Sequence, residues 1–381
     1  MRIAIVDPYI RGIFGQREHL KIAELLSRNN EVDLIVYKIS ENIIQEVRSM
    51  IGSANLIFFT TNSSNKYELL YTIKYMYGGI ADRSLYSFLK DKNYDAIVVI
   101  SSVEGWWLGY MLGNKKRSGR PLTCLVLTDP PTGVSLEYYE HGKHSGLTAL
   151  FDNLFIKFQK FRLDRFDCIF GQSEWTNDIM KKIYGINVIG KAGGINTEKF
   201  NITKVVINDE EPYIAVPTVA LDSKRRNIIR MLYRAGVRMR LYGPVKLDIP
   251  GELGFISDEE MINVLGNASA TLFLFDYEGL GLIPLESLSL GTPVITEKRL
   301  GPGAELSGNR YVTFVNGFED TLKACRDRLT EKPTYEERLK IRESVKQYSF
   351  ENFAGLIERT LAEKLNAYNA GVQQKKCKAI S

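Results

Sequence analysis

Cysteine and histidine are scarce in this sequence, with four cysteines and three histidines among 381 residues. The cysteines are scattered along the chain, at Cys124, Cys168, Cys325 and Cys377. No two of them stand at the short spacing of a zinc or redox site, so we expect reduced structural thiols. His141 and His144 lie close together in "EHGKHSG", but the glycines around them favour a loop over a helix that would align two ligands. The sequence therefore predicts no metal site.

The chain also lacks long apolar runs and a strong net charge. No stretch approaches the roughly 18 uninterrupted apolar residues that a membrane-spanning helix needs. The opening residues, "MRIAIVDPYI", are typical of a short strand and a proline turn and not of a signal peptide, so we expect a cytoplasmic protein. A net charge of +5 does not indicate a nucleic-acid partner. It is compatible with anionic small molecules and with peripheral contact at a membrane surface.

The sequence does contain a regular alternation of apolar and helical segments, over a length suited to two domains. At 381 residues the chain is too long for one ordinary domain. Apolar runs such as "RIAIV", "VDLIVY" and "YDAIVVIS" alternate with helical stretches such as "REHLKIAELLSR". This alternation predicts the α/β class with doubly wound sheets.

A polar, acidic stretch near the middle of the chain separates the two predicted domains. The segment "FNITKVVINDEEPYIAV" turns polar before a new strand begins at Tyr213. We predict a first domain over residues 1–205 and a second over residues 206–346. A final helical tract covers about 347–370, and the basic tail at 371–381 is expected to be frayed.

Two glutamates flank a glycine-rich turn in "DYEGLGLIPLESLSLGTPVIT", residues 276–296. The apolar run "ATLFLF" just upstream predicts a buried strand of a parallel sheet. Gly279 and Gly281 supply the freedom for a sharp turn into the helix that follows. Ligands of such sheets bind at the carboxyl ends of strands and the amino ends of helices. Glu278 and Glu286 both fall where a ligand is expected.

This segment resembles the signature of retaining glycosyltransferases of the family 4 type, within glycosyl transferases group 1. That signature has two glutamates separated by seven residues, followed by Gly-Thr-Pro-Val-Ile, and the spacing is intact here. Leu280 replaces the usual Phe, and Ile283 shifts Pro284 by one place. Four other segments resemble the family in the same order: "GQSEWTNDIMKKIYGIN", "VIGKAGGINTEKF", "GFISDEEMINVLGNASATLFLF" and "YSFENFAGLIERTL".

The resemblance covers the second domain closely and the first domain loosely. It implies the GT-B fold, in which two Rossmann-like, doubly wound domains face each other across a cleft. By the same resemblance, the second domain binds the nucleotide-sugar donor and the first binds the acceptor. The final helix, at about 347–370, is expected to return to the first domain and complete it.

The resemblance also implies roles for the two glutamates. Glu278 is expected to hydrogen-bond hydroxyls of the donor sugar beside the reacting carbon, as a catalytic residue. Glu286 is expected to clasp the two ribose hydroxyls, which suits the two acceptor oxygens of a carboxylate. A carboxylate in a first helical turn is also favoured by the helix dipole alone, but the spacing to Glu278 favours the functional interpretation. Backbone N–H groups of the turn are expected to contact sugar or phosphate: Gly279, Leu280, Gly281 and Leu282.

Three cations stand at the entrance of another predicted helix, in "LDSKRRNIIRM". They are Lys224, Arg225 and Arg226. Cationic side chains and helix amino ends stabilise phosphate, and Ser223 is the candidate N-cap. The family has an Arg at the preceding strand end and a Lys five residues later, and here the Arg position falls near Leu221. The sequence leaves open which of the three cations binds the diphosphate.

Two further glycine turns are candidate phosphate sites. Gly301 and Gly303, in "GPGAEL", open another predicted helix and could present N–H donors to phosphate or sugar. Gly12 and Gly15, in "RGIFG", lie between the first strand and the first helix. A phosphate or acceptor loop and an ordinary tight turn explain this second pair equally well.

Two other strand ends carry candidate contacts. By resemblance, backbone groups around "GFIS", including those of Phe255 and Ile256, hold the nucleotide base. Asp129, in "LTDPPTG", follows a predicted strand where the family often has a His or Asp near the reacting sugar. It is our catalytic candidate in the first domain, although an Asx turn before the prolines is the preferred explanation for it.

The stretch "FDNLFIKFQKFRLDRF" interleaves aromatic and basic residues. The aromatic residues are Phe151, Phe155, Phe158 and Phe166, and the cations are Lys157, Lys160, Arg162 and Arg165. A basic aromatic helix can lie on an anionic membrane. More often such a stripe packs on a sheet with its charges in solvent, and that is the interpretation we favour.

The sequence therefore predicts a retaining, metal-independent hexosyltransferase that uses a nucleotide sugar and no cofactor. The acceptor is a hydroxyl of a glycan, lipid or protein. One alternative keeps the GT-B fold but makes the protein a sugar-nucleotide epimerase. Another is a non-catalytic nucleotide- or glycan-binding protein, which the missing strand-end Arg near Leu221 keeps open.

Overall fold

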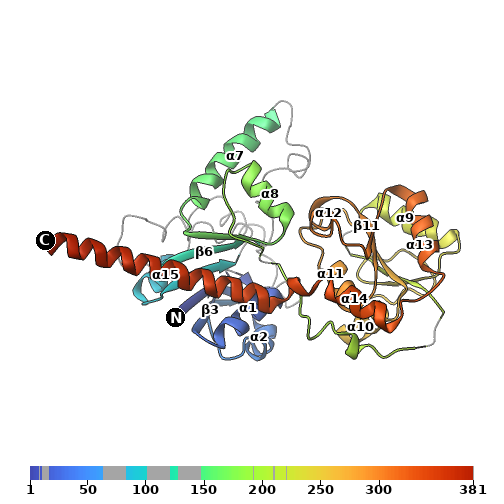
Figure 1. Ribbon diagram of the computed structural model, residues 1–381, viewed down its shortest axis with the longest axis horizontal. Coiled ribbons are helices and arrows are strands. Elements are labelled where there is room, and N and C mark those ends of the chain that lie inside the picture. The colour runs from blue at the N-terminus through green and yellow to red at the C-terminus, as the bar shows by residue number, and fades with distance from the viewer. Residues whose placement is uncertain are drawn as a thin grey trace. The chain divides into compact units, whose positions relative to one another are not determined.

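The structure, a computed structural model, consists of two compact units (Figure 1). The first unit comprises residues 1–172, 176–193 and 350–381, and the second comprises 173–175 and 194–349. The structure describes residues 1–7, 9–10, 17–62, 83–100, 121–127, 147–191, 193–208, 211–219 and 221–380.

In the first unit, the described strands form one parallel sheet in the order β2-β3-β1-β5-β6-β7, with β4 paired to β3. The strands are β1 (Arg2–Val6), β2 (Tyr9–Ile10), β3 (Glu31–Ser40), β4 (Asn55–Asn62), β5 (Ala96–Ile100), β6 (Leu122–Leu127) and β7 (Cys168–Gly171). β5 and β6 are buried along their whole length, as expected for a parallel sheet covered on both faces. The strand order reverses between β1 and β5, which is where ligands of doubly wound sheets bind.

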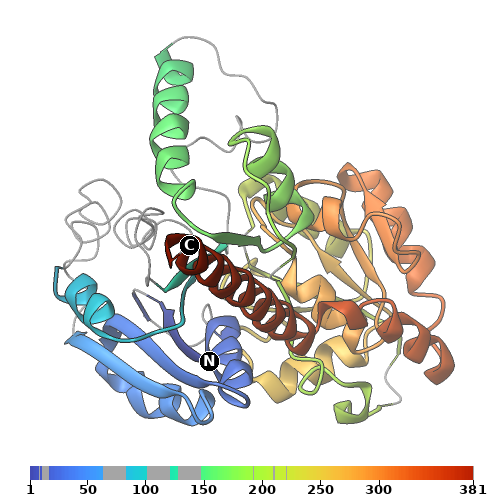
Figure 2. The same cartoon turned by 60° about the vertical axis from the view of Figure 1, so that its left-hand side comes forward.

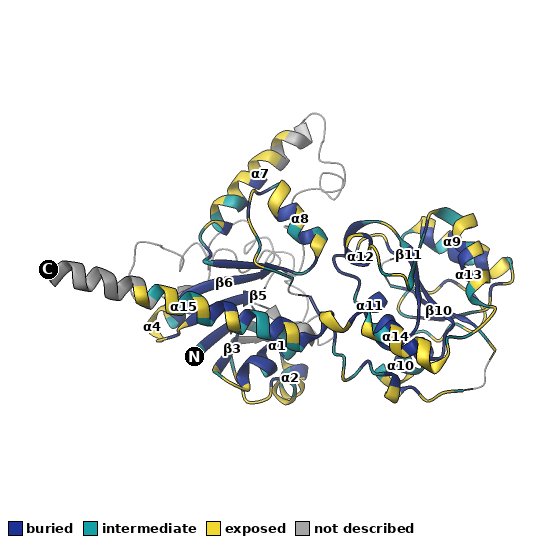
Figure 3. Ribbon diagram, viewed as in Figure 1, coloured by how far each residue is buried: buried dark blue, intermediate teal, exposed yellow. Residues whose placement is uncertain are grey.

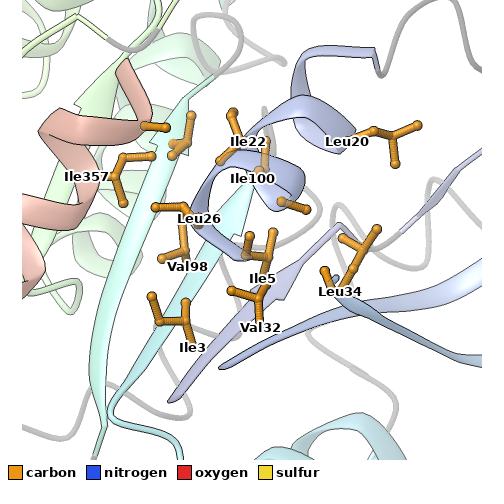
Figure 4. Close-up of a cluster of buried hydrophobic side chains, with 14 of the residues drawn as sticks. Ile3, Ile5, Leu20, Ile22, Leu26, Val32, Leu34, Val98, Ile100 and Ile357 are labelled. Carbon is orange, nitrogen blue, oxygen red and sulfur yellow. The ribbon is translucent and has the colours of Figure 1, made fainter. Parts of the chain in front are cut away.

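Helices from both ends of the chain cover this sheet. They are α1 (Arg17–Ser27), α2 (Ile44–Met50), α4 (Arg83–Asp91), α7 (Leu147–Leu163), α8 (Glu174–Lys182) and α15 (Phe350–Ile380). The core joins Leu26 of α1 and Ile357 of α15 to Ile5 and Val98 of the sheet (Figure 4). Figure 2 shows α15, in dark red, running across this unit, where it contacts α1. The final helix therefore belongs to the first unit.

The second unit holds a parallel sheet in the order β12-β11-β10-β8-β9. Its strands are β8 (Ile214–Pro217), β9 (Met239–Tyr242), β10 (Ala270–Phe273), β11 (Val294–Glu297) and β12 (Val312–Val315). Its helices are α9 (Ser223–Arg234), α10 (Asp258–Gly266), α11 (Leu282–Ser289), α12 (Leu300–Glu305), α13 (Gly317–Arg328) and α14 (Tyr335–Glu343). The strands are largely buried beneath these helices (Figure 3). The order reverses between β8 and β10, so a ligand is expected beside their carboxyl ends.

The predicted α/β class with doubly wound sheets is confirmed. The compact units change at Gly193 and Gly194, whereas the predicted boundary follows residue 205. α15 continues as a helix to Ile380, where a frayed tail was predicted from residue 371. Short 3-10 turns occur at Glu41–Ile43, Ile202–Lys204 and Lys346–Tyr348.

The expectation of reduced thiols is wrong for one pair of cysteines. Cys124 of β6 and Cys168 of β7 are register partners on neighbouring strands, with Cα atoms 4.5 Å apart, and they form a disulfide. They are 44 residues apart in the chain, so only strand pairing brings them together. Cys325 is free and buried.

α7 carries apolar residues on two opposite sides. Ile156 and Leu163 are buried, and so is Phe166 just beyond the helix, at 6% exposed. The outer side carries an exposed apolar stripe at helical spacing: Leu150, Leu154, Phe158 and Phe161 are 57, 56, 44 and 50% exposed. Burial of Phe166 agrees with the favoured expectation of a packed aromatic stripe, whereas the exposed ring of Phe158 contradicts it. Among the described helices, none is long and apolar enough to cross a membrane.

Candidate active site

The turn after β10 and the helix α11 that follows it carry the two predicted glutamates, at the carboxyl end of the second unit's sheet. Glu278 lies in the turn and Glu286 lies about one turn into α11. Gly281 closes the turn with φ +96°, a left-handed conformation that favours glycine. A Cβ on Gly281 would also lie 3.0 Å from Cγ of Pro302. The backbone of this strand, turn and helix therefore fixes the positions of the two glutamates relative to each other.

A second glycine turn, at the start of α12, packs directly against the first. A Cβ on Gly301 would lie 2.0 Å from the carbonyl oxygen of Gly279, and one on Gly303 would lie 2.7 Å from the carbonyl carbon of Lys298. The N–H of Gly301 donates to the carbonyl of Glu278 at 3.2 Å, and that of Gly303 donates to the carbonyl of Arg299 at 2.9 Å. Both N–H groups were predicted as phosphate donors. In the structure they are used within the protein, and the glycines allow the two turns to approach closely.

The side chain of Glu278 folds over the amino end of α11. Its Oε1 accepts hydrogen bonds from the N–H groups of Gly281 at 3.1 Å and Leu280 at 3.3 Å. Burial raises the pKa of Glu278, while the N–H groups of Gly281, Leu280 and Gly279 act in the opposite direction. Two of the N–H groups predicted to hold the donor are therefore occupied by the protein's own carboxylate.

Glu286 lies near the end of β9. The last residue of that strand, Tyr242, is buried, and its burial raises its pKa. The negative charge of Glu286 raises the pKa of Tyr242 further. The side chain of Glu286 therefore lies within electrostatic reach of the phenol.

Arg225 is held by carboxylates. Its guanidinium donates to both oxygens of Glu297, at 2.7 and 3.1 Å, and to Asp222 at 2.7 Å. Asp276 lies 3.6 Å away. Asp222 is also the N-cap of α9, because its Oδ1 accepts from the N–H of Arg225 at 2.8 Å, so the predicted cap at Ser223 is wrong.

The other two predicted cations differ from Arg225. Lys224 is exposed, and Arg226 is half-buried, with its Nε donating to the carbonyl of Leu221 at 3.0 Å.

Arg299, which was not predicted, lies at the start of α12. Its Nη1 donates to the carbonyls of Phe275 and Asp276, at 3.2 and 2.6 Å. The position of Arg299 just after β11 is the sequence signal that could have identified it.

The sequence of residues 252–348 matches the glycosyl transferases group 1 family. We call residues 252–348 the group 1 segment. The predicted resemblance to glycosyl transferases group 1 is therefore confirmed for this part of the chain. No curated protein sequence matches the chain.

The fold is similar to those of solved structures over nearly whole chains. Sucrose-phosphate synthase from Thermosynechococcus elongatus superposes with a TM-score of 0.66 and 15% identity, over 96% of this chain and 100% of that chain. HepE from Anabaena, in complex with UDP and glucose, gives 0.61 and 12%, over 95 and 99%. WaaG, a glycosyltransferase involved in lipopolysaccharide biosynthesis, gives 0.60 and 13%, over 94 and 98%. The predicted GT-B fold is confirmed.

The group 1 segment includes both glutamates and both glycine turns, but it begins after the three cations of α9. It also includes the predicted base loop. There the carbonyl of Gly254 accepts from the N–H of Gly243 at 2.7 Å, so the loop lies beside the end of β9. Phe255 is 83% exposed, whereas Ile256 packs partly against a hydrophobic cluster.

One motif from outside the group 1 segment contacts it. Residues 173–175, from "GQSEW", belong to the second unit. The hydroxyl of Ser173 donates to the buried carbonyl of Gly279 at 2.7 Å, and the N–H of Glu174 donates to Oε2 of Glu305 at 2.8 Å. Ser173 therefore supports the turn that carries Glu278.

In the first unit, the predicted Gly12, Gly15 and Asp129 lie outside the described residues, as do His141 and His144. The described part of the binding edge holds a pair that was not predicted. Nδ1 of His19, in α1, lies 2.7 Å from Oδ2 of Asp7, which follows β1 and is buried.

Proposed function

We propose that the protein is a retaining glycosyltransferase that moves a sugar from a nucleotide-sugar donor to a hydroxyl acceptor, without a metal ion. One observation carries this proposal. Within the group 1 segment, Glu278 lies in the turn before α11 and Glu286 lies about one turn into that helix, and the turn follows a strand at the strand-order reversal of a parallel sheet. The match to the group 1 family supports nucleotide-sugar glycosyl transfer as the reaction.

The chemistry requires a rigidly held sugar and a stabilised diphosphate. Breaking the anomeric C–O bond leaves negative charge on the diphosphate, and preoriented N–H groups and cations stabilise such charge. In this proposal Glu278 leaves the N–H groups of Gly281 and Leu280 when the donor enters, and it then binds hydroxyls of the donor sugar. Glu286 binds the ribose. The leaving phosphate helps to deprotonate the acceptor hydroxyl on the same face of the sugar, which retains the anomeric configuration.

The diphosphate is assigned to Arg226 and Lys224 and not to Arg225. The guanidinium of Arg225 is already engaged by Glu297 and Asp222. Binding a diphosphate with Arg225 would break a nearly buried ion pair and bring two carboxylates close to the phosphate.

The donor site is tested by thermal shift with UDP-, GDP-, ADP- and dTDP-sugars. UDP-sugars come first because the HepE structures contain UDP and UDP-glucose. We expect one nucleotide class to raise the Tm by about 5 °C at a hundredfold excess over Kd. Glu286→Ala removes this shift. Glu319→Ala is the control, since it removes a glutamate from another helix of the second unit, α13, and it keeps the shift.

Turnover and stereochemistry distinguish the alternatives. Slow hydrolysis of the bound donor, with an anomerically retained product by NMR, supports the proposal, whereas an inverted product contradicts retention. Binding without any hydrolysis points to the non-catalytic alternative. Conversion of the sugar nucleotide into its epimer without an acceptor points to the epimerase.

We also propose that the protein works in the cytoplasm at an anionic membrane surface, with α7 as the contact. The stripe of Leu150, Leu154, Phe158 and Phe161 faces solvent on the side opposite to the buried residues of α7. Arg162 lies over the ring of Phe158, with its guanidinium carbon 4.1 Å from the ring centroid. Apolar residues flanked by cations match the boundary between lipid head groups and acyl chains. This contact favours a lipid-linked acceptor over a soluble glycan or protein.

A further inference from the structure

Tyr242 has a buried hydroxyl that no described residue binds. The side chain is 6% exposed, and its ring belongs to a hydrophobic cluster with Phe200, Ile262 and Leu290. The hydroxyl oxygen has no hydrogen-bond partner within the described part of the chain. Buried polar groups in native proteins are almost always paired, and an unpaired one costs stability. An unpaired hydroxyl at a strand end is therefore a candidate ligand contact.

The surroundings of Tyr242 indicate what the ligand is. Tyr242 lines a cavity of 280 Å³ at the carboxyl ends of β8 and β9, together with Thr218, Gly243 and Gly254. The cavity therefore borders the predicted base loop. Burial raises the pKa of Tyr242, and the charge of Glu286 raises it further. A tyrosine hydroxyl is already protonated at neutral pH, so the phenol is available as a hydrogen-bond donor.

We infer that Tyr242 is a ribose-binding residue, whose hydroxyl donates a hydrogen bond to a ribose hydroxyl of the donor beside Glu286. The inference rests on the proposed function and adds a residue that the two-glutamate signature does not contain. A ribose carries two neighbouring hydroxyls, each of which both donates and accepts. A protonated phenol and a carboxylate supply one donor and two acceptors for them.

A second tyrosine of the same cluster provides a matched control. Tyr213 is 2% exposed, and its hydroxyl donates to the carbonyl of Val264 at 2.8 Å. Tyr213→Phe leaves that buried carbonyl unpaired, so it should lower the midpoint of urea unfolding without changing nucleotide affinity. Tyr242→Phe removes a hydroxyl that has no described partner, so it should leave the midpoint unchanged or raise it.

Binding is measured by titration calorimetry with UDP, GDP and the 2′,3′-dideoxy form of each. We expect Tyr242→Phe to weaken binding of the ribonucleotide about 3- to 10-fold. It should also reduce the preference of the protein for the ribonucleotide over the dideoxy form, which a structural defect alone would not do. Tyr213→Phe should keep both the affinity and the preference.

The outcomes separate this inference from the proposed function. If the wild-type protein binds a nucleotide and Tyr242→Phe changes neither affinity nor ribose preference, the inference is overturned and the donor site stands. If the wild-type protein binds neither UDP nor GDP in any form, both are overturned. An equal loss of affinity for the ribose and dideoxy forms would also overturn the inference, because it would place the hydroxyl away from the ribose.

Discussion

The carboxylate of Glu278 accepts a hydrogen bond from the N–H of Gly281, so the predicted catalytic group occupies the amino end of the helix that follows it, α11. A helix amino end attracts anions, and without a donor the nearest anion is this side chain. Donor binding in the proposed mechanism is thus an exchange, in which one anion leaves the N–H groups and another takes its place.

Replacing Glu278 by Ala should separate catalysis from donor binding. The change removes a contact made with the reacting sugar, and we expect kcat to fall by at least about 100-fold. Nucleotide affinity should stay the same or increase, because the N–H groups no longer have an internal competitor. Kinetics and calorimetry on one preparation measure both quantities, and a large loss of nucleotide affinity would contradict the exchange.

The raised pKa of Glu278 should make stability depend on pH. A carboxyl group whose folded-state pKa is raised stabilises the fold when it is protonated, and this contribution is lost as pH rises from below its ordinary value of 4.5 through the raised value. Glu278→Gln cannot lose a proton, so the variant should gain stability relative to the wild-type protein as pH rises through that window. Urea unfolding at pH 4 to 8 measures the difference. If the difference in unfolding free energy between the variant and the wild-type protein does not change with pH, the pKa of Glu278 is not raised.

Replacing Gly301 by Ala should disrupt the site through packing. The added Cβ would overlap the carbonyl of Gly279, and the backbone on both sides must shift. We expect a loss of about 2 kcal/mol or more in the free energy of unfolding, together with weaker donor binding. Gly355→Ala is the control in α15, where the new Cβ meets only the flexible end of Arg359 and stability should stay the same or rise. Equal effects of both changes would contradict close packing of the two turns.

Arg225 and Arg226 should respond differently to substitution. Arg225→Ala leaves Glu297 and Asp222 without their shared partner, and we expect a loss of about 3 kcal/mol in unfolding free energy. Arg226→Ala should cost less than about 1 kcal/mol but weaken nucleoside diphosphate binding. Urea unfolding and calorimetry test the pair. A loss of affinity in Arg225→Ala alone, at unchanged stability, would reverse the assignment.

The exposed stripe on α7 should bind anionic vesicles. We expect the protein to sediment with vesicles that contain phosphatidylglycerol and much less with pure phosphatidylcholine, and added salt should weaken the binding. Leu154→Ser with Phe158→Ser should abolish it. Met231→Ser, which changes an exposed apolar residue of α9, should leave it intact. Equal sedimentation of wild-type protein and the double variant would remove α7 as the contact.

Local pattern was sufficient to predict much of the second unit. The apolar run before Asp276, the glycines of the turn and the spacing of the two glutamates predicted a strand, a sharp turn and a helix, because these features depend on residues close together in the chain. The Asp222 cap was missed in favour of Ser223, since either residue type can cap a helix and only the backbone conformation selects one.

Contacts between distant parts of the chain were not predictable in this way. The α/β class, the two-glutamate turn and the resemblance to group 1 glycosyltransferases could be predicted, because hydrophobic period and short-range spacing encode them. Three relationships are visible only once the chain is folded: Glu297 binds Arg225, Gly301 packs on Gly279, and the buried hydroxyl of Tyr242 feels the charge of Glu286. These relationships arise where separate strands of a parallel sheet end at one edge, and strand order sets them, not distance along the chain.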